Sequence, residues 1–202
     1  MEFIYIKTNT LTDQFCSDLI QIFESASDYQ YKGVTSGGLN VNIKDTMDLK
    51  FPILPDCSNN NTLINLLYQM NLTLNNILYS ELKNYMIEIA KDKLKYAKFY
   101  DTGFQMQKYD KGTGKYIFHN DFGIDIENKS KRVLTYLWYI NTVEEGGETL
   151  FGDDIRVKPE AGKLVIFPSC WTYPHKACVP LSSDKYIVTG WFYANDDDFL
   201  TS

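Results

Sequence analysis

The chain has 202 residues, of which 44% are hydrophobic and 15% aromatic, a composition typical of a folded globular protein with a sizeable core. Its formal net charge of −6 and its pI near 4.9 argue against a broad surface for nucleic acid or anionic membrane. No window approaches the roughly 20 apolar residues that span a bilayer, and the opening MEFIYIKTNT lacks the apolar core of a signal peptide. We therefore expect a cytoplasmic protein that binds neither membrane nor nucleic acid.

The four cysteines do not form a metal-binding or redox motif. Cys16, Cys57, Cys170 and Cys178 lack any C-x-x-C spacing. Such usage indicates a reducing compartment and free thiols that pack as small hydrophobic side chains.

The first segments predict a short strand followed by a helix. MEFIYIKT is strand-like, and the residues from Thr10 to Asp13 supply hydroxyl and carboxylate groups that cap helix N-termini. Apolar side chains then recur at helical spacing over residues 12–26, from Phe15 to Phe23. We expect this helix to pack on the outside of a sheet.

Residues 29–60 are rich in glycine and proline at irregular spacing, which is typical of turns around short strands. A long polar segment of this kind is either a functional lid or an exposed connection. Within IKDTMDLKF, the charges of Lys44, Asp45 and Asp48 fit a solvated loop better than a substrate contact. A loop from Gly33 to Asp48 that closes over a substrate remains the alternative.

Residues 62–95 carry apolar side chains at spacings of three and four without proline or glycine. This pattern predicts one long helix, or two helices with a break near Asn75 and Asn76. The methionines and aromatics of this stripe are typical of core packing, so the helical segment is expected to cover a sheet.

From residue 96 onward the chain reads as short β-branched and aromatic runs separated by Gly, Asp, Asn and Pro. Helices followed by strands indicate an α+β fold, and the strand count fits a double-stranded β-helix, or jelly roll, with a pocket between its sheets. We expect one domain over residues 1–202, with helical support mainly in 10–95 and the barrel core mainly in 96–195.

The only two histidines of the chain suggest a metal site. On an extended strand His119 and Asp121 share a face, about 7 Å apart. If His175 arrives from a neighbouring strand, two imidazoles and one carboxylate surround one side of an ion, which is the ligand set of non-haem Fe(II) oxygenases. His-x-Asp alone is a pattern of low specificity, so the hypothesis depends on its context.

Two strands place polar groups on one face, where they can line a pocket. Gln105, Gln107 and Tyr109 alternate along the first strand, and Lys185 shares a face with Trp191 on the last. Lys185 is the most informative of these residues, because a buried ammonium needs an anionic partner or loses its charge.

Together, His119, Asp121, His175 and Lys185 resemble the motif of iron- and 2-oxoglutarate-dependent dioxygenases of the prolyl 4-hydroxylase type. The spacing from Lys185 to Trp191 matches this family as well. This combination is far more specific than His-x-Asp alone.

Flanking segments extend the resemblance from about Phe99 to Tyr193. The run from Tyr109 to His119 is similar to the segment before the first metal ligand in the hypoxia-sensing prolyl hydroxylases. GGETLF at 146–151 resembles the family's Gly-Gly-x-Thr-x-Phe hairpin.

The resemblance implies Fe(II) bound by His119, Asp121 and His175, with three positions left for 2-oxoglutarate and O₂. It implies that Lys185 pairs with the far carboxylate of 2-oxoglutarate, a contact strengthened by a sheltered site. Ascorbate is the reductant expected for such enzymes.

Further contacts are expected from tyrosine, threonine and other side chains near this site. Cosubstrate contacts are assigned to Tyr109, Tyr139 and Thr149, and substrate contacts to Tyr116, Gln107 and Trp191. A tyrosine on a barrel strand is otherwise a packing residue, so these roles are less specific than the metal ligands.

The resemblance implies hydroxylation of a prolyl residue in a peptide or protein, coupled to conversion of 2-oxoglutarate into succinate and CO₂. Lysyl residues, free proline or another small metabolite remain alternative substrates, whereas the acidic chain and the position of Lys185 disfavour a nucleobase demethylase. A function of another class is a catalytically silent β-helix module that binds peptides or acts as a sensor. The intact ligand set and Lys185 speak against that alternative.

Overall fold

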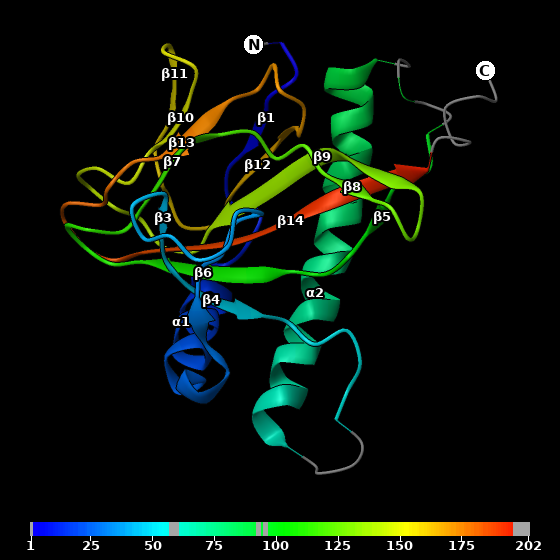
Figure 1. The fold of residues 1–202 in the computed structure, drawn as a ribbon. Coiled ribbons are helices and arrows are strands. Elements are labelled where there is room, and N and C mark those ends of the chain that lie inside the picture. Colours follow the sequence, from blue (N-terminus) through cyan, green and yellow to red (C-terminus); the bar gives the residue numbers. More distant parts are fainter. Residues whose placement is uncertain (1, 57–60, 92–93, 95–96, 196–202) are drawn as a thin grey trace.

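Two antiparallel β-sheets face each other, and helices cover the outer face of the larger sheet, in the computed structural model of residues 2–56, 61–91, 94 and 97–195 (Figure 1). This architecture confirms the predicted α+β class with a jelly-roll core and supporting helices from the N-terminal half.

The larger sheet contains nine strands and the smaller sheet five. The strand order of the larger sheet is β1 (Tyr5–Lys7), β12 (Lys163–Pro168), β9 (Ser130–Tyr139), β14 (Lys185–Asn195), β6 (Gln105–Tyr109), β4 (Met47–Lys50) and β2 (Tyr31–Lys32), with β5 (Tyr100–Asp101) beside β14 and β8 (Ile124–Asp125) beside β9. The smaller sheet has the order β11 (Ile155–Val157), β10 (Thr149–Phe151), β13 (His175–Ala177), β7 (Lys115–His119) and β3 (Lys44–Asp45).

Helix α1 (Asp13–Ser25) forms where the sequence predicts it. The Thr12 hydroxyl caps its N-terminus by accepting a hydrogen bond from the backbone N–H of Phe15, at 3.2 Å. The helix buries Cys16, Leu19 and Phe23 against the larger sheet. A short 3₁₀ turn (Ser27–Tyr29) follows it.

Helix α2 (Thr62–Tyr85) is continuous through Asn75 and Asn76, so the alternative with a break there is wrong. It continues as a π-helical turn (Met86–Ala90) that ends at Lys91, whose φ of 45° lies in the left-handed region. Residues 92–93 and 95 of the predicted helical segment lie outside the described residues. None of the helices in the described ranges combines the length and apolarity needed to cross a bilayer.

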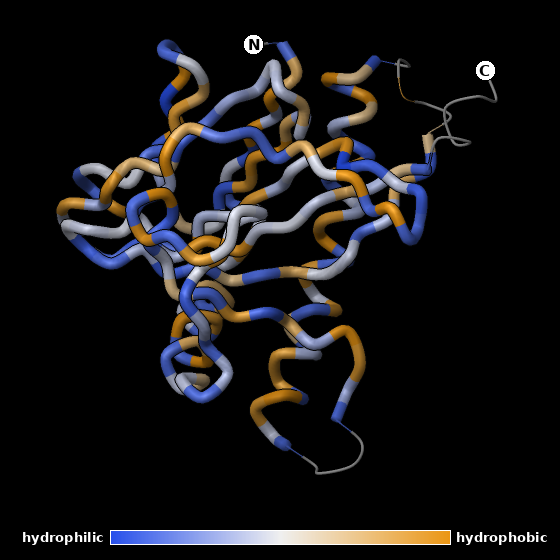
Figure 2. The backbone as a smooth tube through the Cα atoms, viewed as in Figure 1, coloured by the Kyte–Doolittle hydropathy of each residue, from blue (hydrophilic) through white to orange (hydrophobic). Residues whose placement is uncertain are grey.

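The period of two along the central strands separates two hydrophobic cores. On β9, Leu134 and Trp138 join the core beneath the helices, whereas Leu137 and Tyr139 join the core between the sheets. The helices therefore cover one face of the larger sheet and leave the other face to build a pocket. Figure 2 shows hydrophilic segments at outer turns, such as the tip of the β10–β11 hairpin.

The charged segment before α2 differs from the sequence prediction. Lys44 and Asp48 do not lie in a solvated loop, because they are 4% and 0% exposed and their Nζ and Oδ2 atoms are 2.6 Å apart. Asp48 also accepts hydrogen bonds from Thr46 and Gln105. Side chains alternate between the two faces along β3 and β4, and both Lys44 and Asp48 fall on the inward face. There they form a buried ion pair.

Asp45 alone matches the expected exposure, since its carboxylate lies 3.5 Å from Lys32 in a partly solvated ion pair. Three cysteines are free thiols, as predicted: Cys16 is buried, and Cys170 and Cys178 are half-buried. Cys57 lies outside the described residues.

We expect Lys44→Met to lower the free energy of unfolding by about 3 to 5 kcal/mol, because it leaves a buried carboxylate uncompensated. Adding Asp48→Asn should recover most of that loss. The matched surface change Lys32→Met should cost at most about 1 kcal/mol. Urea denaturation measures all three variants, and equal costs for Lys44→Met and Lys32→Met would contradict the role of the buried pair.

Candidate active site

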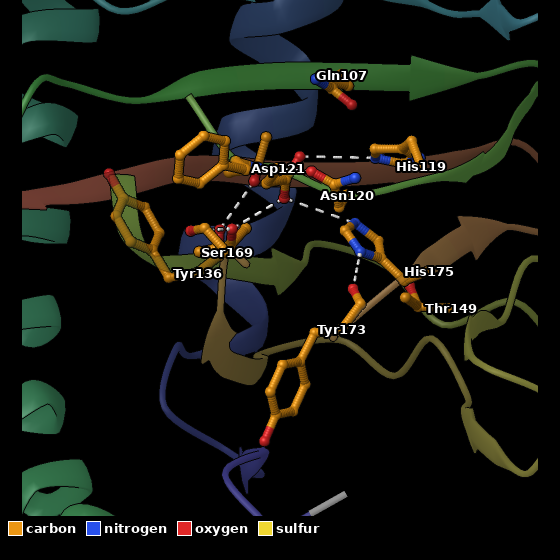
Figure 3. A network of polar contacts seen from close by, with 12 residues as sticks. Gln107, His119, Asn120, Asp121, Tyr136, Thr149, Ser169, Tyr173 and His175 are labelled. Atoms are coloured by element: carbon orange, nitrogen blue, oxygen red, sulfur yellow. Dashed lines mark hydrogen bonds and ion pairs between the residues drawn. The ribbon is translucent and has the colours of Figure 1, made fainter. Parts of the chain in front are cut away.

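Strand pairing in the smaller sheet brings the two histidines together. Strand β13 runs antiparallel to β7 with His175 directly opposite His119, and their ring centroids are 4.3 Å apart. The sequence predicts His119 and Asp121 on one strand, but β7 ends at His119 and Asp121 follows it outside the strand. The carboxylate nevertheless turns back toward both rings (Figure 3).

The three side chains fit the coordination of one metal ion. Asp121 Oδ1 lies 3.6 Å from His119 Nε2, and Asp121 Oδ2 lies 3.6 Å from His175 Nε2. One ligand atom from each residue lies within 4.8 Å of the others. Metal–ligand bonds of about 2.1 Å at right angles place neighbouring donor atoms about 3 Å apart, so a small closure suffices. Two imidazoles and one carboxylate suit iron.

Backbone carbonyl groups select the imidazole tautomers. His119 Nδ1 lies 2.8 Å from Ile117 O, and His175 Nδ1 lies 3.2 Å from Tyr173 O. A carbonyl oxygen can only accept a hydrogen bond, so each Nδ1 carries the proton. Each Nε2 therefore directs a lone pair toward Asp121, as a metal ligand requires.

The protonation states also suit a cation. Burial and the neighbouring His175 lower the pKa of His119 to about 4, so this imidazole is neutral at pH 7. Burial raises the pKa of Asp121, but His175 and His119 outweigh it and lower the pKa below its usual value. The site thus presents an ionised carboxylate beside an uncharged imidazole.

A pocket between the two sheets connects this cluster with the last strand. Its walls come from β6, β7, β9, β10, β13 and β14 and from the turn after β7. The lining residues are Gln107, Tyr109, Tyr116, His119, Asp121, Thr135, Leu137, Thr149, His175, Ala177, Lys185, Ile187, Thr189 and Trp191. Nine of the ten site residues predicted from sequence line this pocket, and Tyr139 is the exception.

Lys185 is a buried cation without an ion-pair partner among the described residues. It is 1% exposed, its Nζ donates to Gly147 O at 3.0 Å, and it lies 4.1 Å from the ring centroid of Tyr109. Burial lowers its pKa to about 7. An anion that enters this end of the pocket meets an ammonium that lacks a counter-charge.

Three hydroxyl groups expected to contact a cosubstrate differ in their positions. Thr149 and Tyr109 line the pocket, whereas the Tyr139 hydroxyl lies behind Thr149 and donates to its Oγ1 at 2.6 Å. Tyr109 donates to Gln107 Oε1 at 2.9 Å. Thr149 thus retains its own proton for a pocket ligand, and Tyr139 orients Thr149.

Aromatic rings border the site near the metal ligands. The Tyr116 ring stacks on His119 with centroids 3.5 Å apart and an interplanar angle of 14°. Trp191 lies beneath the Arg132 guanidinium, whose Cζ is 3.9 Å from the indole centroid. The Tyr116 ring therefore covers one face of the His119 imidazole, and Trp191 lines the same pocket.

Sequence reasoning missed three polar residues next to the cluster. Thr135 and Ser169 form a hydrogen-bonded pair that reaches Asp121, and Arg132 donates from Nε to the Tyr193 hydroxyl at 2.7 Å. Thr135 could have been found from the alternation of β9, where it is a lone hydroxyl between apolar neighbours. Ser169 and Arg132 carry no comparable signal.

Residues 104–193 match the sequence model of the 2OG-Fe(II) oxygenase superfamily. Among curated relatives, prolyl 4-hydroxylase 13 of Arabidopsis thaliana is 28% identical, over 48% of this chain and 44% of the relative. The prolyl 4-hydroxylase subunit alpha-2 of Gallus gallus is also 28% identical, over 48% of this chain and 20% of the subunit. The chain thus spans less than half the length of either relative.

The fold is shared with solved prolyl hydroxylases. The viral collagen prolyl hydroxylase of Paramecium Bursaria Chlorella virus-1 in its 2OG complex has a TM-score of 0.64 at 20% identity, covering 95% of this chain and 96% of that chain. A Trichoplax adhaerens prolyl hydroxylase in complex with a hypoxia inducible factor peptide fragment has a TM-score of 0.68 at 19% identity, covering 100% and 88%. Residues 104–193 thus resemble the 2OG-Fe(II) oxygenase superfamily, and the chain has the fold of these solved prolyl hydroxylases.

Proposed function

We propose that this protein hydroxylates a prolyl residue of a peptide or protein, with residues 1–202 acting as one oxygenase domain. The observation that carries the proposal is the convergence of His119, Asp121 and His175 on one side of a pocket whose other end holds the buried ammonium of Lys185. A metal ligand set and an unpaired cation in one pocket suit a cosubstrate that chelates iron at one end and carries a carboxylate at the other.

The reaction consumes 2-oxoglutarate, O₂ and a C–H bond and yields succinate, CO₂ and an alcohol. Fe(II), when bound, supplies the O₂ chemistry. His119 and His175 hold it through Nε2 and Asp121 through its carboxylate. Lys185 and the Thr149 hydroxyl bind the far carboxylate of 2-oxoglutarate.

The remaining pocket residues orient the reactants and exclude water. Leu137 and Ile187 contribute apolar walls, and Gln107 and Tyr109 form a hydrogen-bonded pair beside Lys185. Tyr116 and Trp191 border the substrate next to the metal ligands. The prolyl substrate is supported by the Trichoplax relative, which was solved with a peptide, and by the prolyl 4-hydroxylase relatives. Of the segment expected to close over that substrate, only residues 34–43 are free to do so, because Lys44 and Asp48 are buried in β3 and β4.

We expect the wild-type chain, given Fe(II), 2-oxoglutarate, ascorbate and a proline-containing peptide library, to release succinate and add one oxygen atom to a prolyl residue. Asp121→Ala should reduce both signals to background, because it removes the only carboxylate of the ligand set. Asp153→Ala, which changes an exposed carboxylate in the β10–β11 turn, is the matched control. Mass spectrometry locates the oxygen.

Each result of this assay discriminates between functions. Succinate without peptide oxidation would contradict a prolyl substrate and favour a small metabolite. Oxygen on a lysyl residue would show that lysine, and not proline, is the residue hydroxylated. Peptide binding without any turnover would favour the silent module.

We expect the affinity for 2-oxoglutarate to fall as pH rises above 7. Burial lowers the pKa of Lys185 to about 7 in the free protein, and pairing with a carboxylate raises it in the complex. Below pH 7 the ammonium is charged in both states, so the Kd is constant. Above pH 7 binding takes up a proton, so the Kd rises by up to about tenfold per pH unit.

Calorimetry between pH 6 and 8.5 tests this dependence with saturating Mn(II) in place of Fe(II), which prevents turnover. Lys185→Arg provides the control, because guanidinium stays charged and its affinity should not change with pH. Lys185→Met should weaken binding by about 2 to 5 kcal/mol, the cost of losing one partner of a buried charge pair. A wild-type Kd that is constant over this range would exclude Lys185 as the titrating contact.

A further inference from the structure

Two buried hydroxyl groups form a chain that ends on the Asp121 carboxylate (Figure 3). Thr135 Oγ1 donates to Asp121 Oδ2 at 2.8 Å and lies 2.9 Å from Ser169 Oγ. Thr135 is 2% exposed and Ser169 1%, so water does not substitute for either contact.

The chemistry of the groups gives this chain one direction. An ionised carboxylate only accepts hydrogen bonds, so the single proton of Thr135 points to Asp121. Thr135 Oγ1 can then only accept from Ser169, whose proton points to Thr135. The order of donation is therefore Ser169 to Thr135 to Asp121.

The chain connects a turn to a rigid strand. Asp121 lies beyond the end of β7, where no ladder hydrogen bond holds it, whereas Thr135 lies in the middle of β9. Thr135 is paired there with Phe167 of β12 and Trp191 of β14. A hydrogen bond from this position transmits the rigidity of the larger sheet to a carboxylate that follows the smaller one.

The orientation of that carboxylate matters for the number of open coordination positions. A carboxylate that rotates freely can present both oxygens to one cation. In a site of two histidines and one carboxylate, a second oxygen would take a position needed for cosubstrate or O₂. Thr135 engages Oδ2 and thereby limits rotation about the bond that joins the carboxylate to its side chain.

We propose that Thr135 is a positioning residue that holds the Asp121 carboxylate in one orientation toward His119 and His175, and that Ser169 orients Thr135. This inference rests on the proposed function in assuming a metal at this cluster. It assigns a role to two residues that have none in the proposed reaction.

The decisive measurement is Mn(II) affinity, by calorimetry on the metal-free full chain without 2-oxoglutarate. Thr135→Val keeps the shape but loses the hydroxyl, and it should weaken Mn(II) binding about 10- to 100-fold, as is typical for loss of a partner of a metal ligand. Thr135→Ser keeps the hydroxyl and should bind Mn(II) nearly as the wild type does. If Thr135 only fills space, the order reverses, because serine lacks the buried methyl group and valine retains it.

Ser169→Ala provides a second, independent test. It should weaken Mn(II) binding less than Thr135→Val, since Thr135 still donates to Asp121 but is no longer oriented. The matched control is Ser130→Ala on the same strand as Thr135, because Ser130 is buried and its Oγ has no hydrogen-bond partner among the described residues. Ser130→Ala should leave the affinity unchanged.

The assay separates this inference from the proposed function. Unchanged Mn(II) affinity in both Thr135→Val and Ser169→Ala would overturn the positioning role while leaving the oxygenase proposal intact. The expected order of affinities without any turnover would support the positioning role and count against the proposed reaction. If Thr135→Val fails to fold by circular dichroism, the comparison of Ser169→Ala with Ser130→Ala decides the outcome. A wild-type chain that binds no Mn(II) would overturn both proposals.

Discussion

The antiparallel register of β13 on β7 is the constraint on which the site depends, because it places His175 opposite His119. These residues are 56 positions apart in the chain, and only the sheet brings their rings to a centroid distance of 4.3 Å. A shift of this pairing by one residue would turn one imidazole to the opposite face of the sheet, and the three ligands would no longer converge. The smaller sheet therefore determines where a metal can bind, although it contributes fewer strands than the larger one.

The larger sheet determines what surrounds that position. Along β14, Tyr186, Val188 and Phe192 pack beneath the helices, whereas the alternating residues face the pocket. The same division on β9 sends Leu134 and Trp138 to the helices. Because α1 and α2 build an apolar core on one face, the other face can carry polar groups that a fully apolar core would not tolerate. The alternation of side chains along β9 and β14 thus produces both the apolar face under the helices and the polar face of the pocket.

Several features were predictable from sequence because they depend on local pattern. The period of the apolar residues predicts α1 and α2, and the spacing of His119, Asp121, His175 and Lys185 indicates the chemistry of the site before any contact is known. Helix propensity alone could not predict whether α2 continues through Asn75 and Asn76, because tertiary packing outweighs two weak helix formers. The apolar stripe on both sides of the asparagines lies against the sheet, and this packing keeps the helix whole.

Other features depend on long-range pairing and were not readable. Lys44 and Asp48 look like residues of a solvated loop, yet their strands belong to different sheets and meet at the edge of the sandwich. The roles of Thr135 and Ser169 likewise require the register between β9 and β12, which places Ser169 beyond the last pair of that ladder. Sequence identifies side chains able to ligate or donate, whereas the partners of those side chains follow only from the sheet register.

Lys185 illustrates how an unfavourable group can be retained in such a fold. The buried ammonium of Lys185 contacts the Gly147 carbonyl and the Tyr109 ring. It therefore destabilises the folded chain relative to an apolar side chain of similar size. The pKa of Lys185 is lowered for the same reason, because burial disfavours the charged form of the amine. A carboxylate that enters the pocket pairs with the ammonium and removes this cost, so the same free energy then favours binding of the anion.

The metal ligands lie at the other end of the same pocket. A molecule can therefore bind at both ends only if its carboxylate and its chelating group are the right distance apart. Under the proposed function, the positions of β13 and β14, which the two sheets hold in place, therefore select the cosubstrate by its length.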